Sequence, residues 1–152
     1  MLQNWYPQLL TLHNWLRWAV VIAAIVAAYV AVTGWSGGRN DTNFLMRASR
    51  PFVGFMDLQF LLGLALYFFA SPVVHQAMQN MSAAMKDHDM RFFAVEHTTA
   101  MFLALILAHV GSVMARKRPT PQARHRGAAI CYLLSLALIL IGMPWFRPLL
   151  RY

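Results

Sequence analysis

The stretch AVVIAAIVAAYVAV, residues 19–32, contains no charged residue. A helix of a soluble domain would need a polar outer face, and this stretch has none. With its neighbours it forms an apolar segment over about residues 12–34, close to the roughly 20 residues that a helix needs to cross a bilayer. The stretch therefore predicts a membrane-spanning helix.

Similar apolar segments follow along the chain. Hydrophobic residues make up 59% of the sequence and charged residues 12%, about half the charged share of a soluble domain. Short connections make successive helices antiparallel. We therefore expect an all-α integral membrane protein, a single membrane domain over residues 1–152 that forms an up-down bundle of four transmembrane helices. The expected spans are about residues 12–34, 52–70, 92–115 and 127–146.

The basic residues predict an orientation. The net charge is +8, and eight of the 13 Lys and Arg lie in two connections, residues 34–51 and 116–126. The positive-inside rule places these connections in the cytoplasm and both termini outside. Here the basic residues would meet anionic lipid, and no nucleic-acid motif is visible, so the lipid bilayer and not a nucleic acid is the expected partner.

The beginning of the chain and its cysteine content narrow the picture further. Nothing before Arg17 is positively charged, so we expect no cleaved signal peptide and a first span that stays in the mature protein. Cys131 is the only cysteine. It excludes an internal disulfide and a metal site of paired cysteines.

Ionisable residues within membrane spans are costly and usually functional. His13 and Arg17 come early in the first span, while Glu96 and His97 come early in the third. Since both spans would enter from outside, these four residues are expected at one outer depth.

Each of these histidines begins a helical stripe of mostly small residues. At about 100° per residue, two faces follow from the sequence. They are His13, Arg17, Val20, Ala24, Ala27 and Ala31 in the first span, and His97, Met101, Ala104, Ala108 and Gly111 in the third. Close helix packing alone explains such stripes, but it does not explain two histidines at one depth.

Two imidazoles from facing helices are suited to holding a b-type heme. We therefore predict His13 and His97 as ligands of the heme iron. Arg17 and Arg91 would bind the two propionates. No C-x-x-C-H motif is present, so the heme would be non-covalent. The alternative is that both histidines are hydrogen-bonded residues at helix ends, with Arg17 paired to Glu96.

A second polar layer is expected towards the cytoplasm. Asp57 and Gln59 of the second span and His109 of the third would lie there. The favoured interpretation is that Asp57 and His109 neutralise each other, and a proton path or a second heme at His109 are the alternatives. A second bis-histidine heme lacks a partner, because the fourth span contains no histidine.

The outer connection offers a different chemistry. Its methionines Met78, Met81 and Met85, with His75 and His88 nearby, could serve as ligands for Cu(I). The favoured alternative is a short amphipathic helix that lies on the bilayer with its methionines facing the lipid.

Four stretches together resemble a group of small bacterial four-span membrane proteins described as cytochrome-b-like. They are LHNWLRW (12–18), DLQFLLGLALYF (57–68), RFFAVEHTTAMFLALILAHVG (91–111) and GMPWFRP (142–148). The resemblance implies a b-type heme and electron transfer, with His13 and either His97 or His109 at the matching positions.

The expected function is electron transfer by a heme b near the periplasmic face of the bacterial inner membrane. The partners would be a quinone or the other subunits of a membrane complex. No nucleophile–base pair or phosphate loop is present, so no catalytic activity of its own is expected. The alternatives are a heme-free accessory subunit and, less favoured, a periplasmic copper-binding membrane protein.

Overall fold

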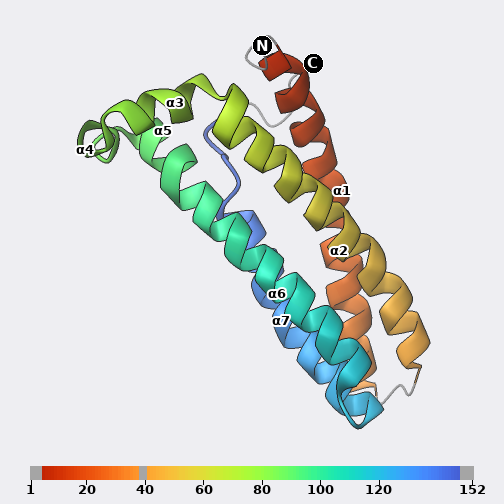
Figure 1. The fold of residues 1–152 in the computed structure, drawn as a ribbon. Helices are drawn as coiled ribbons and strands as arrows, with labels where there is room; N and C mark the ends of the chain where they lie inside the picture. Colours follow the sequence, from red (N-terminus) through yellow and green to blue (C-terminus); the bar gives the residue numbers. More distant parts are fainter. Residues whose placement is uncertain (1–4, 38–40, 148–152) are drawn as a thin grey trace.

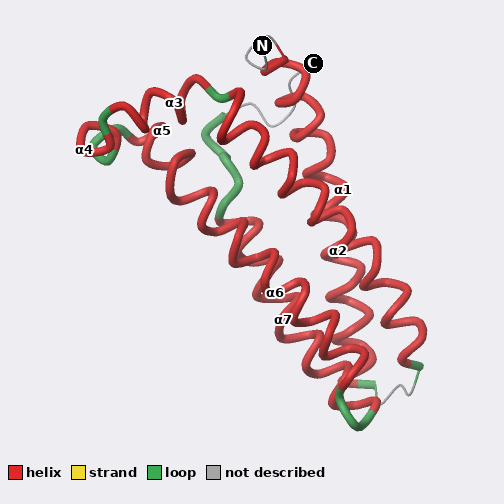
Figure 2. Tube along the Cα trace, in the orientation of Figure 1, coloured by secondary structure: helices red, strands yellow, loops and turns green. Residues whose placement is uncertain are grey.

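The computed structural model describes residues 5–37 and 41–147. Throughout these residues the regular structure is helical, with no strand (Figures 1 and 2). The segments η2 and η3 are single π-helical turns that continue or precede an α-helix. The elements are α1 (Tyr6–Ser36), α2 (Thr42–Ala65), η2 (Leu66–Ala70), α3 (Pro72–Gln79), α4 (Met81–Ala84), α5 (His88–Arg91), η3 (Phe92–Glu96), α6 (His97–Lys117) and α7 (Pro121–Ile141).

Four long helical segments form an up-down bundle, as the sequence predicts. Each is long and apolar enough to cross a membrane, so the chain is a multi-pass membrane protein. In the bundle α1 packs on α2, α2 on α6, α6 on α7, and α7 back on α1. The four segments are Tyr6–Ser36, Thr42–Ala70, His88–Lys117 and Pro121–Ile141.

The second helix begins about ten residues earlier than the span expected at 52–70. Asp41 provides the reason, because its side chain accepts a hydrogen bond from the backbone N–H of Phe44 at 3.0 Å. An aspartate at this position caps a helix N-terminus. Pro51 consequently lies inside α2 and not at its start. Much of the expected loop 34–51 is therefore helical.

The fourth helix ends earlier than the span expected at 127–146. It stops at Ile141, and the backbone N–H of Gly142 closes the last turn on Leu138 O at 2.9 Å. Pro144 then prevents the helix from continuing. The residues after α7 turn back over the bundle, and this return places Gly142 and Arg147 beside α6 and η3.

The two stripes of small residues are buried where the helices of the bundle pack closely. Val20, Ala24, Ala27 and Ala31 are buried in α1, and Ala104, Ala108 and Gly111 are buried in α6. The helices approach so closely at Gly111 that an added Cβ would lie 2.5 Å from the Tyr132 ring. Nearby, the Ser135 hydroxyl donates to Ala104 O at 2.7 Å.

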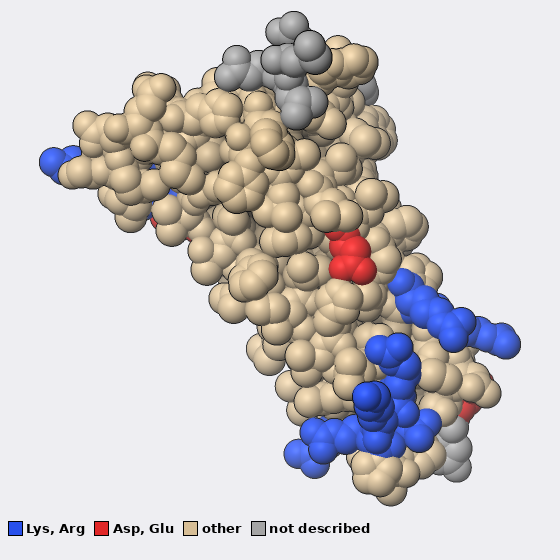
Figure 3. Space-filling model, viewed as in Figure 1, with Lys and Arg blue, Asp and Glu red and all other residues tan. Residues whose placement is uncertain are grey.

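The two ends of the bundle differ in their content of basic residues. Lys and Arg side chains gather at the end where α1 joins α2 and α6 joins α7 (Figure 3). The opposite end carries α3, α4 and α5, which project sideways from the bundle (Figure 1).

Candidate cofactor-binding cavity

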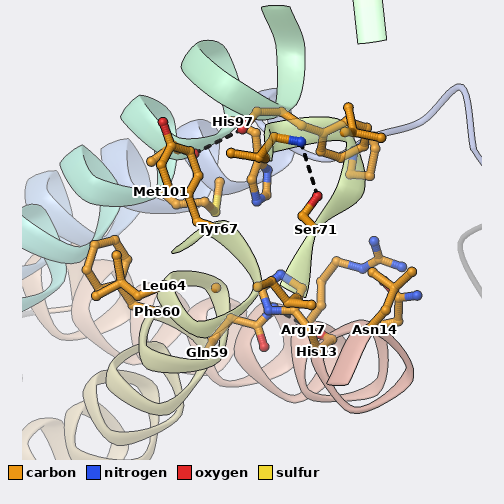
Figure 4. A pocket seen from close by; sticks show the side chains of 18 of the residues that line it. His13, Asn14, Arg17, Gln59, Phe60, Leu64, Tyr67, Ser71, His97 and Met101 are labelled. Carbon is orange, nitrogen blue, oxygen red and sulfur yellow. Dashed lines mark hydrogen bonds between the residues drawn. The ribbon is translucent and has the colours of Figure 1, made fainter. Parts of the chain in front are cut away.

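A cavity of about 140 Å³ lies among α1, α2, η2, η3 and α6, near the end that carries α3–α5 (Figure 4). Its walls combine apolar side chains with an unusual number of polar ones for the interior of a membrane bundle. The polar lining residues are Tyr6, His13, Asn14, Arg17, Gln59, Tyr67, Ser71, His97, Thr98 and Arg147.

His13 and His97 meet in this cavity, as their matched depth in the sequence predicts. Figure 4 shows His13 extending into it from α1 and His97 from the opposite side. The ring centroids are 6.3 Å apart and the ring planes make an angle of 69°. Two imidazoles from helices that are not neighbours in the sequence therefore share one cavity.

A backbone carbonyl fixes the orientation of His97. The Nδ1–H of His97 donates to Gly142 O at 2.7 Å. The second nitrogen, Nε2, then carries the lone pair. Metal-ligating histidines usually donate their other ring N–H to a carbonyl or a carboxylate in this way. His97 is therefore prepared to act as a ligand through Nε2.

The backbone carbonyl of His13 accepts a hydrogen bond, while its ring lines the cavity. The Gln59 side chain donates from Nε2 to His13 O at 3.0 Å. Within the part of the chain that the structure describes, Nδ1 of His13 is buried and has no hydrogen-bond partner. Gly63 lies beside the ring, and a Cβ added there would be in ordinary van der Waals contact with it, 3.5 Å from His13 Cε1. A buried nitrogen without a partner costs stability, so a group bound in the cavity could offset that cost.

Two arginines give the cavity a positive character. Arg17 is only 7% exposed, and its guanidinium lies 5.7 Å from the ring centroid of Trp18. Arg147 lines the same cavity, lies 4.6 Å from the ring centroid of Phe93 and pairs with Asp89 outside the lining. None of the described residues that line the cavity is acidic. The cavity therefore suits a ligand that is largely apolar and partly anionic.

Arg91, the predicted second propionate partner, is placed elsewhere. Its Nε lies 2.6 Å from Glu96 Oε1, and its guanidinium also donates to Met85 O at 3.2 Å. Arg91 is not among the residues that line the cavity. Glu96 is thus paired with Arg91. The alternative in which both histidines are helix-end residues had paired Glu96 with Arg17. Arg147 is the second cavity arginine, and the early end of α7 is what brings it there.

Two π-helical turns border the cavity. Tyr67 in η2 donates from its hydroxyl to Ala94 O in η3 at 3.0 Å. This bond joins the end of the second span to the beginning of the third. Single π-turns inside α-helices often occur at functional sites. Here they bring Tyr67 and Phe93 into the cavity lining.

The predicted contact between Asp57 and His109 is confirmed. His109 Nε2 lies 2.7 Å from Asp57 Oδ1. Gln59, however, does not belong to an inner layer with them, because it reaches His13. The reason is helical spacing, because residues two apart point about 200° away from each other, so that Gln59 faces α1 while Asp57 faces α6.

The residues of the copper alternative are dispersed. Asn80, at φ −147° and ψ 85°, separates α3 from α4, so Met78 does not share a helical face with Met81 and Met85. His75 and His88 bind other groups, Phe68 O at 3.1 Å and Asp89 Oδ1 at 3.2 Å respectively. In the described residues no group of three or more His, Cys, Asp or Glu is arranged to hold a metal ion.

The fold and the cavity together define the class, a small multi-pass membrane bundle with a cavity that contains two histidines. The chain matches no family model, no curated protein and no solved structure. The function must therefore be argued from the cavity itself.

Proposed function

We propose that the chain binds one b-type heme non-covalently between His13 and His97 and transfers electrons. The separation of the two imidazoles carries the proposal. A metal ion about 2 Å from one nitrogen of each ring would put the ring centres roughly 6 Å apart. The observed separation is 6.3 Å. His97, held by Gly142, and His13 would be the two residues that hold the iron.

The charge of the cavity supports the same ligand. A heme is a large apolar ring with two carboxylates at one edge. Arg17 would provide a cation for one of those carboxylates, and charge-assisted hydrogen bonds of this kind are among the stronger ones in proteins. Arg147 also lines the cavity but is paired with Asp89, so it would meet the second carboxylate only by sharing or exchanging that partner. The apolar side chains of Phe60, Leu64 and Met101, which also line the cavity, would contact the ring.

The cavity has to widen to admit a porphyrin. Its volume of about 140 Å³ is below the roughly 300–1,000 Å³ of pockets that enclose drug-sized ligands. Leu64 and Met101 are flexible side chains on its wall, and Met in particular adapts its shape easily. Heme binding would therefore require these side chains to change rotamer, while the backbone that holds the two histidines stays in place.

Bound heme would supply one-electron chemistry. The chain's own residues would hold the ring, orient the imidazoles and exclude water. The electron partner would be a quinone or another subunit of a membrane complex. We propose an electron-transfer protein without a reaction of its own. Its location would be the bacterial inner membrane, with the heme near the periplasmic face.

The alternative is a heme-free accessory subunit of a larger membrane complex. One observation favours it, namely that the face formed by α2 and α6 is exposed and carries the polar pair Asp57–His109. An absorption spectrum separates the two proposals. The purified protein, expressed with a heme supply, is measured oxidised and then after reduction by dithionite. Heme binding predicts a Soret band and sharp bands of the reduced form. A protein that never takes up heme would instead support the accessory role.

Replacing Arg17 by alanine should weaken heme binding without abolishing it. The change removes one charge-assisted contact, of about 1.5–3 kcal/mol, so affinity should fall roughly tenfold to a hundredfold. The midpoint potential should also fall, because a cation near the porphyrin favours the reduced and less positive iron. Heme titration and potentiometry measure both effects. Arg91→Ala is the matched control, since Arg91 is bound to Glu96, and it should change neither quantity.

The orientation has its own test. The basic ends of the helices predict that both termini face the periplasm. A reporter that fluoresces only in the cytoplasm, fused after Tyr152, should therefore stay dark, while the same reporter inserted between Pro119 and Pro121 should fluoresce. Strong fluorescence at the C-terminus would reverse the orientation and move the cavity to the cytoplasmic side.

A further inference from the structure

The face formed by α2 and α6 is the least buried part of the bundle. In the most apolar stretch of the spans Thr42–Ala70 and His88–Lys117, 22% of the residues are buried, against 50% in Tyr6–Ser36 and 39% in Pro121–Ile141. The α2–α6 face therefore presents the largest share of side chains to whatever surrounds the protein. The exposed apolar residues of these two helices include Phe55, Leu58, Leu61, Phe102, Ile106 and Val110.

An ionisable pair lies within this apolar face. The side chains of Asp57 and His109 are 45% and 51% exposed. Asp57 is the sixteenth residue of the 29-residue span, and Figure 3 shows acidic atoms partway along the bundle, among residues other than Lys, Arg, Asp and Glu. Ionisable groups at this depth almost always face protein or water, because contact with lipid tails is costly. The pair is therefore expected to be covered by protein.

The pair is complementary to a copy of itself. His109 uses Nε2 and Asp57 uses Oδ1 for their mutual bond. The other nitrogen of His109 and the other oxygen of Asp57 make no hydrogen bond within the described part of the chain. When both ring nitrogens of His109 carry a proton, Nδ1–H is a donor and Oδ2 of the Asp57 carboxylate is an acceptor, and the two lie side by side.

The common orientation of all copies in the membrane allows two such pairs to meet in a symmetric contact. All copies of one chain have the same orientation in the bilayer, so a two-fold axis between two copies runs along the membrane normal. Such an axis brings residues of equal depth together. His109 of each copy could then donate from Nδ1 to Oδ2 of Asp57 in the other copy, which closes a ring of four side chains.

The surface beside the pair permits close approach. Gly54 lies one helical turn before Asp57, and residues three apart share a helix face. A Cβ added at Gly54 would meet nothing within 4 Å. Small residues at such a position let two membrane helices come close, and interhelical hydrogen bonds then add stability.

We infer that the α2–α6 face is a homodimer interface, in which the Asp57–His109 pairs of two copies meet across a two-fold axis. The partner is a second copy because the pair supplies both charges that the contact needs. This inference does not depend on heme, since the face lies outside the lining of the cavity.

The test uses the full-length protein in lipid vesicles, with donor and acceptor fluorophores on separate copies. Energy transfer should rise with the protein-to-lipid ratio and saturate at the level of a dimer. Gly54→Trp should weaken association about tenfold or more, because the indole would occupy the space of the second helix. Tyr29→Trp is the matched control, since Tyr29 is 68% exposed on α1, and it should leave association unchanged. Circular dichroism and thermal unfolding check that each variant folds.

Charge variants test the pair itself. Asp57→Ala and His109→Ala should each weaken the dimer, and the exchange of Asp57→His with His109→Asp should restore part of it. His13→Ala should leave the dimer intact, which separates a failure of this inference from a failure of heme binding. A wild-type protein that stays monomeric at every protein-to-lipid ratio, or a dimer that Gly54→Trp does not weaken, would overturn the inference. So would association only with a different membrane protein.

Discussion

Replacing His13 or His97 by alanine should abolish the heme spectrum, or convert it to that of a weakly held heme with one axial ligand. Each change would remove a coordinate bond to the iron of the proposed heme, and among the described residues the two imidazoles are the only histidine rings that line the cavity. The two variants should therefore behave alike. The measurement is the oxidised and reduced absorption spectrum of the purified protein, together with its heme content.

Two controls make this prediction specific. His109→Ala should leave the spectrum nearly intact, because His109 is bound to Asp57 outside the cavity. Added imidazole should restore part of the spectrum of His97→Ala, since it can fill the space that the side chain leaves. Loss of heme in His109→Ala, with retention in His97→Ala, would show that the proposed ligand pair is wrong.

Replacing Gly34 by alanine should destabilise the bundle by about 1–3 kcal/mol, the usual cost of overpacking a core. An added Cβ would lie 2.0 Å from Nδ1 of His125, and that ring is only 1% exposed. The ring cannot turn into solvent, so α1 and α7 would have to separate. Thermal unfolding in detergent, followed by circular dichroism, measures the loss.

Gly54→Ala is the matched control, because its Cβ would meet nothing within 4 Å. It should not lower the melting temperature. The clash can also be removed by shortening its partner, the His125 side chain. In the background His125→Ala, the change Gly34→Ala should cost much less than it does alone, which a double-mutant cycle quantifies. Equal losses in both backgrounds would mean that the two residues are not in contact.

The fold was predictable because the signals for it are long and repeated. Four apolar segments without polar faces determine the number of spans, and the short connections determine their antiparallel order. The helix ends were less predictable because single residues decide them. Asp41 starts α2 early, and Gly142 with Pro144 ends α7 early. A hydropathy pattern averages over such residues.

The cavity was predictable where depth and helical spacing decide it. These two quantities predicted that His13, Arg17 and His97 share one level, and the structure places all three in the cavity lining. Arg147 was missed, because it follows α7 and reaches the cavity only through a non-helical return of the chain. Gln59 was missed because it was grouped with Asp57 by depth alone, whereas the two residues lie on different faces of α2 and contact α1 and α6 respectively.

The hydrogen bond from His97 to Gly142 limits how the sequence of α7 can change. Gly142 O is at the end of a helix of 21 residues, and its direction depends on the number of residues before it. One inserted or deleted residue in α7 would rotate the following residues by about 100° and turn this carbonyl away from the imidazole. Substitutions along α7 can keep the tautomer of His97, whereas insertions and deletions there would lose it. The length of α7, a helix that contributes no histidine to the cavity, therefore affects how His97 is oriented in the cavity.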